Sequence, residues 1–130
     1  MTTSREHLEV RGWSLVYVPH EEIADYNACY RVEYDGELIY PPAADRLEIP
    51  ENEIWISERW RPYERFVLYH ELREIEARAA GLSVEEAHEQ AERAELALWR
   101  HNPLWKRMNR EFGVGREHLP HPTDQFRRRA

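Results

Sequence analysis

The chain has 130 residues and a formal net charge of −7, from 18 basic and 25 acidic side chains. This length suits one domain with a single hydrophobic core, and the 42% hydrophobic content is ordinary for a folded protein. No apolar run approaches the roughly 20 residues of a membrane-spanning helix, and no apolar segment of a secretory signal is visible. The single cysteine, Cys29, has no partner for an internal disulfide. We therefore expect a cytoplasmic protein, or an intracellular or virion protein if a phage encodes it.

The charge is unevenly distributed along the chain. Residues 100–130 contain eight basic and three acidic side chains, so this segment carries +5 and the first 99 residues carry −12. An acidic body does not suit a nucleic-acid surface. We expect one domain over residues 1–112 and a basic tail over residues 113–130, with nucleic acid contacted through that tail alone. A solvated terminus is the other interpretation of the tail.

The first half of the chain predicts a small antiparallel sheet. A short helix or turn is expected over residues 20–28. Asp35-Gly36 lies between two strand segments, and this dipeptide is typical of a type I′ hairpin because both of its residues tolerate positive φ. The strands themselves are expected over residues 13–18, 30–34, 37–40, 47–49 and 54–57.

The second half of the chain predicts helices. A first helix is expected over residues 61–80, where a glycine ends it. Ser83 and Glu86 form a capping box that begins a second helix, running to about residue 101. A third, short helix is expected over residues 103–112, with Pro103 at its start. The fold class is therefore α+β, with a small antiparallel sheet followed by two to three helices.

The motif His70-Glu71-Leu72-Arg73-Glu74 is the most informative feature of the first helix. His70 and Glu74 are four residues apart, so both side chains lie on one face of a helix, one turn apart. We expect this face to lie against the sheet, because apolar residues share it. The stripe on the opposite side is expected to pack on other helices, and it contains Leu68, Leu72, Ile75 and Ala79.

The second helix also carries ionisable residues on its inward face. His88 and Glu95 fall within a stripe formed by Val84, Ala87, Ala91 and Leu98. Inward ionisable groups need partners, because burying them alone is costly. Four side chains of the two helices can satisfy one another through a metal ion: His70, Glu74, His88 and Glu95.

Each of these residues also has an ordinary structural interpretation. His70 and Glu74 could be a helical charge pair, and His88 a core histidine that is hydrogen-bonded to a carbonyl or carboxylate. The same spacing recurs at His88 and Glu92, which we take as coincidence because the two helices share no wider similarity. The combination of inward histidines and glutamates on consecutive helices favours a metal site.

The segment from residue 53 to 76 resembles the core of small zincin-like metallopeptidases of the ImmA/IrrE type. Residues 54–57 match the edge strand of that family, and residues 66–74 match its active-site helix in an HExxE variant, similar to uncharacterised microbial and phage proteins. The resemblance implies a zincin-like domain. It implies three roles: His70, Glu74 and His88 as metal ligands, Glu71 as the general base, and Glu95 as a fourth ligand or a carboxylate orienting a histidine.

Two histidines and one carboxylate form a zinc-ligand set that leaves a position open, and manganese or iron would also suit it. We therefore expect a zinc-dependent peptidase or amide hydrolase that acts on a peptide or protein and has no membrane partner. One alternative is a non-catalytic structural or protein-interaction domain, phage-associated for instance, in which the metal ties two helices together. The other is a metal-free interaction module with a buried hydrogen-bond network. The oligomeric state stays open.

Overall fold

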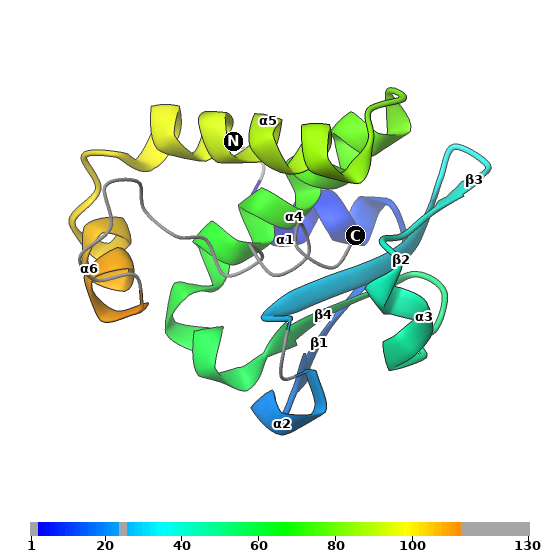
Figure 1. Ribbon diagram of the computed structural model, residues 1–130, viewed down its shortest axis with the longest axis horizontal. Helices are drawn as coiled ribbons and strands as arrows, with labels where there is room; N and C mark the ends of the chain where they lie inside the picture. The colour runs from blue at the N-terminus through cyan, green and yellow to red at the C-terminus, as the bar shows by residue number, and fades with distance from the viewer. Residues whose placement is uncertain (1–2, 24–25, 113–130) are drawn as a thin grey trace.

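Helices cover both faces of a four-stranded sheet in the computed structural model, which describes residues 3–23 and 26–112 (Figure 1). The predicted basic tail, residues 113–130, lies outside the described residues. The α+β class predicted from the sequence is confirmed. None of the helices in the described part of the chain has both the length and the apolar character needed to cross a membrane.

The sheet is mixed, with the strand order β1-β4-β2-β3. β1 lies parallel to β4, whereas β2 is antiparallel to both β4 and β3, so the prediction of an antiparallel sheet was wrong for the β1–β4 pair. Local turn signals determine only the pairing of strands that adjoin in sequence. β1 and β4 are separated by four other elements, so their pairing depends on the tertiary structure. The strands are β1 (Ser14–Val18), β2 (Ala28–Tyr34), β3 (Glu37–Ile39) and β4 (Glu53–Ser57).

The predicted hairpin between β2 and β3 is confirmed. Asp35 and Gly36 connect the strands with φ values of 51° and 89°, the positive values that a type I′ turn requires at both central positions. This turn sets the register in which Val32 pairs with Ile39.

The strand predicted over residues 47–49 does not form. Residues Ala43–Leu47 form the short helix α3, which Pro42 precedes and Glu48 ends with a φ of 57°. Proline is favoured at a helix start because it lacks the N–H that would be unpaired there. The two prolines that end the hairpin therefore also begin a helix.

The three predicted helices of the second half are confirmed, the first two with shifted bounds and the third with the predicted ones. The first helix starts later than predicted, because a 3-10 helix (η1) containing Pro62 precedes it. Like α3, helix α1 in the first half was not predicted, although Thr3 and Glu6 form a capping box at its start. The remaining elements are α1 (Ser4–Val10), α2 (His20–Ile23), η1 (Glu58–Tyr63), α4 (Glu64–Ala79), α5 (Val84–Trp99) and α6 (Pro103–Phe112).

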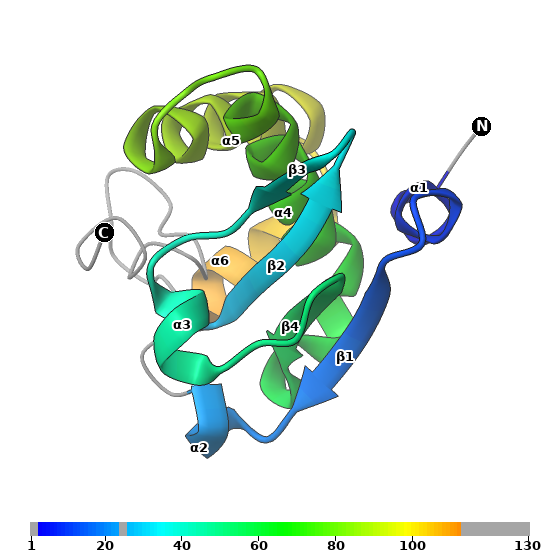
Figure 2. The ribbon, with the colours of Figure 1, turned by 90° about the vertical axis from the view of Figure 1, so that its right-hand side faces the viewer.

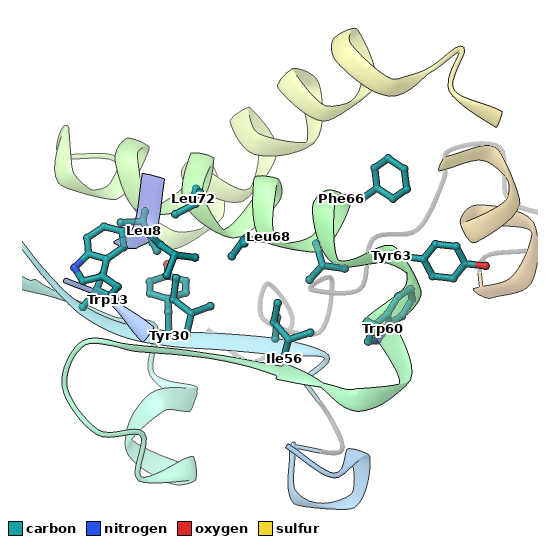
Figure 3. Close-up of a cluster of buried hydrophobic side chains, with 14 of the residues drawn as sticks. Leu8, Trp13, Tyr30, Ile56, Trp60, Tyr63, Phe66, Leu68 and Leu72 are labelled. Carbon is teal, nitrogen blue, oxygen red and sulfur yellow. The ribbon is translucent and has the colours of Figure 1, made fainter. Parts of the chain in front are cut away.

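Strand alternation separates the two faces of the sheet. Tyr30 of β2 and Ile56 of β4 belong to the core between the sheet and α4, whereas Cys29 packs among residues on the opposite face (Figure 3). The short helices α2 and α3 cover that opposite face, and α5 lies outside α4 (Figures 1 and 2). Helix α4 is therefore enclosed between the sheet and α5.

The enclosed position of α4 corrects the predicted orientation of its two faces. Leu68 and Leu72 were predicted to pack on other helices. They lie in the core shared by the sheet, α4 and Leu8 of α1 (Figure 3). His70 contacts α5 instead of the sheet. Glu74 reaches both layers, because it contacts Tyr30 of β2 and His88 of α5.

Candidate metal centre

Helix α4 positions the first two candidate ligands. Nε2 of His70 lies 3.4 Å from Oε1 of Glu74, and both side chains are completely buried. The four-residue spacing produces this contact, because residues one turn apart on a helix are neighbours. The predicted pairing of these two side chains on one face is confirmed.

Helix α5 supplies the third candidate ligand. Nδ1 of His88 lies 3.5 Å from the same oxygen, Oε1 of Glu74, and His88 is also completely buried. One ligand atom from each of His70, Glu74 and His88 lies within 4.8 Å of the other two. Three of the four predicted metal ligands therefore come together at one point between α4 and α5.

The two histidine nitrogens lie at distances from Oε1 of Glu74 that suit ligands of one metal ion, and the three ligand atoms lie within 4.8 Å of one another. Ligands about 2.1 Å from a tetrahedral zinc ion lie about 3.4 Å from one another. The two observed separations, 3.4 and 3.5 Å, are close to that value and longer than ordinary N–H···O bonds. Oε1 of Glu74 accepts no hydrogen bond from the residues described. This buried oxygen is therefore available to a cation.

Tyr30 holds the other oxygen of Glu74. Its hydroxyl donates to Oε2 at 2.8 Å from strand β2, inside the protein. The carboxylate is therefore oriented with Oε1 toward the histidines. Sequence reasoning missed Tyr30, because it lies 44 residues from Glu74 and no spacing rule connects the two.

Each histidine has a second ring nitrogen that is not the one facing Glu74, here called its outer nitrogen. Both outer nitrogens lie close to a carboxylate. Nδ1 of His70 and Oε1 of Glu95 are hydrogen-bonded at 3.2 Å, and Nε2 of His88 lies 3.5 Å from Oε2 of Glu92. Glu95 thus lies beside His70 and outside the three-ligand cluster. Glu92 was missed, although the repeated spacing that we took as coincidence placed it one turn after His88.

Burial and the neighbouring charges shift the pKa values of these carboxyl groups in opposite directions. Burial by itself would raise the pKa of Glu74, but His70 and His88 outweigh it and lower the value to about 2. Burial raises the pKa of Glu95. Glu74 is therefore the carboxylate that stays ionised most readily, as a metal ligand must.

Glu71 is a buried carboxyl group without a partner. The side chain is inaccessible to solvent, and neither carboxylate oxygen has a hydrogen bond within the described ranges. Burial and the charge of Glu74 raise its pKa well above the usual value, and His88 partly opposes them. Such a group is costly unless it serves a function or meets a cation.

The face of α5 that packs on α4 is poorly supplied with apolar side chains. Its buried residues are Ala87, His88, Ala91 and Glu95, two small and two ionisable groups. Leu98, predicted to point inward, is 56% exposed. Trp99, at the end of α5, packs edge-on against Phe66 and Tyr69 of α4. The docking of α5 therefore depends on this aromatic contact and on how its buried histidine and glutamate are satisfied.

No family model, curated protein or solved structure matches this chain. The resemblance to zincin-like peptidases therefore stays a prediction.

Proposed function

We propose that this protein binds one zinc ion through His70, Glu74 and His88 and hydrolyses a peptide or amide bond. The observation that carries the proposal is the fully buried carboxyl group of Glu71, which has no hydrogen bond from the described residues and whose pKa responds to the charges of the ligands Glu74 and His88. A structural metal site gives no reason to place a further carboxyl group without hydrogen bonds next to it. A hydrolytic site needs such a group as a base.

The number of ligands supports an open coordination position. Glu95 contacts the outer nitrogen of His70, which leaves three protein ligands. Catalytic zinc sites commonly have three protein ligands and keep the fourth position for water or substrate. A bound zinc ion there supplies a Lewis acid that polarises a carbonyl and makes water more acidic.

Glu71 would then act as the proton acceptor. Its pKa responds to the charges of Glu74, His88 and Glu95, so it lies within electrostatic reach of the ligands. As a carboxylate it would take a proton from the attacking water and pass it to the leaving amine. Burial and the charge of Glu74 raise the pKa of Glu71, and a carboxylate with a raised pKa is a stronger base.

A structural metal site is the second candidate, and burial favours it. The three ligand side chains are completely inaccessible to solvent, whereas a substrate has to reach a catalytic centre. The weak apolar face of α5 gives a metal ion a structural purpose as well. In this case the ion joins α4 to α5 without turnover.

Elemental analysis of protein purified without an affinity tag tests the metal itself. We expect about one zinc per chain in the wild type and in His101→Ala, a control in which an exposed histidine is replaced. We expect none in His88→Ala. A wild type that holds no metal and takes up none from added zinc would refute both candidate functions.

The Glu71→Gln variant separates the two candidates. With a library of fluorogenic peptides as substrate, the hydrolase proposal predicts cleavage by the wild type and loss of turnover in Glu71→Gln at full metal content. Equal cleavage by both proteins would contradict the role of Glu71. A wild type that holds zinc but cleaves no peptide would support the structural candidate.

A further inference from the structure

The two candidate histidine ligands present different ring nitrogens to Glu74. His70 presents Nε2 and His88 presents Nδ1. A neutral imidazole carries its proton on one nitrogen and offers the lone pair of the other to a metal. This geometry therefore requires opposite tautomers at the two positions, with the proton of His70 on Nδ1 and that of His88 on Nε2.

A carboxylate lies at each position where such a proton is required. Oε1 of Glu95 is hydrogen-bonded to Nδ1 of His70, and Oε2 of Glu92 lies 3.5 Å from Nε2 of His88. Both come from α5, and their side chains approach the rings from the side away from Glu74. An acceptor at the outer nitrogen favours the tautomer whose inner nitrogen is unprotonated.

We propose that Glu95 and Glu92 are positioning residues that fix opposite tautomers of His70 and His88 for metal binding. This inference rests on the metal site proposed above and adds the groups that tune it. Together with the hydroxyl of Tyr30 on Glu74, it gives each of the three ligands its own polar partner outside the site.

The contacts of Glu95 and Glu92 with the two histidines should differ in strength. The side chain of Glu95 is 4% exposed and hydrogen-bonded at 3.2 Å, whereas that of Glu92 is 27% exposed and lies at 3.5 Å. Water screens a partly exposed contact more than a buried one. The contribution of Glu95 to metal affinity should therefore exceed that of Glu92.

Zinc affinity, measured by competition with a chelator, tests whether Glu95 and Glu92 contribute to metal binding. We expect Glu95→Ala to weaken zinc binding by about 10- to 100-fold, the range typical for loss of such a partner. Glu95→Gln keeps an acceptor oxygen and should recover part of that loss, and Glu92→Ala should cost less than Glu95→Ala. Glu89→Ala, an exposed change on the same helix, should bind as the wild type does.

Nitrogen-15 spectra of the imidazole rings in the zinc-loaded protein test the tautomers directly. We expect the proton on Nδ1 of His70 and on Nε2 of His88 in the wild type. The same two proton positions should be found in Glu95→Gln. This variant is the fallback if Glu95→Ala does not fold. Identical tautomers at the two histidines, or Glu95 variants that bind zinc as tightly as the wild type, would overturn this inference while leaving the metal site intact. Absence of zinc in the wild type would instead overturn the proposed function.

Discussion

Zinc should raise the thermal stability of this protein substantially, because its three candidate ligands come from two helices. His70 and Glu74 belong to α4 and His88 to α5, so an ion held by all three binds only when the helices are docked. Binding energy therefore becomes folding energy.

The size of the effect follows from linkage. Free zinc at 100 times its dissociation constant stabilises the folded state by about 2.7 kcal/mol. A chain of 130 residues unfolds with an entropy of about 0.27 kcal/mol/K, from about 2.1 cal/mol/K per residue. The ratio predicts an increase in Tm of about 10 °C.

This increase in Tm can be measured by calorimetry of chelator-treated protein. One sample contains no zinc, and the other contains free zinc buffered at 100 times the measured dissociation constant. His88→Ala removes the only α5 ligand of the cluster and should abolish it. The exposed-histidine variant His101→Ala should keep it.

Two results would refute the reasoning. One is a wild-type Tm that zinc leaves unchanged. The other is an equal shift in wild type and His88→Ala, since zinc would then bind elsewhere. Either result would leave the buried histidines and glutamates as a hydrogen-bonded network without a metal.

Three further predictions concern groups around the site and in the sheet. Tyr30→Phe removes the donor to Oε2 of Glu74 and should lower the unfolding free energy of the metal-free protein by about 1.5–3 kcal/mol in urea; an unchanged midpoint would contradict that contact. Burial holds the pKa of Glu71 above its unfolded value, so metal-free wild type should lose stability as the pH rises from about 4.5 through the folded pKa. Glu71→Gln should flatten that fall in urea titrations at pH 5 to 8, and an unaltered pH profile would show that Glu71 is not its source. Gly36→Ala places a side chain at a φ of 89° and should cost about 1–2 kcal/mol, measured by urea unfolding, and a costless change would mean a different turn.

Local sequence signals determined the elements whose partners lie close along the chain. Asp35-Gly36 specifies a hairpin because only a few residues tolerate positive φ at both positions. Ser83 and Glu86 mark the start of α5 because they satisfy unpaired N–H groups there. The four-residue spacing of His70 and Glu74 likewise sufficed for their contact, since it depends only on helical geometry.

Contacts between distant segments escaped such rules. The parallel pairing of β1 with β4 joins strands that four other elements separate. Helix α4 directs His70 toward α5. The partners of the candidate ligands were also unpredictable from local signals when they lie far away in the sequence. Tyr30 meets Glu74 only because strand alternation and the packing of α4 on β2 bring them together.

The sequence by itself determined which side chains capable of binding a metal lie on inward helical faces, because periodicity is a property of a single helix. Only the tertiary structure decided which atoms converge. It brought Nε2 of His70 and Nδ1 of His88 to one oxygen of Glu74 and placed Glu95 at the other ring nitrogen of His70. It also left Glu71 without a hydrogen bond from any residue that the structure describes. Those relations depend on the rotation and distance of α5 relative to α4, and no spacing within either helix encodes them.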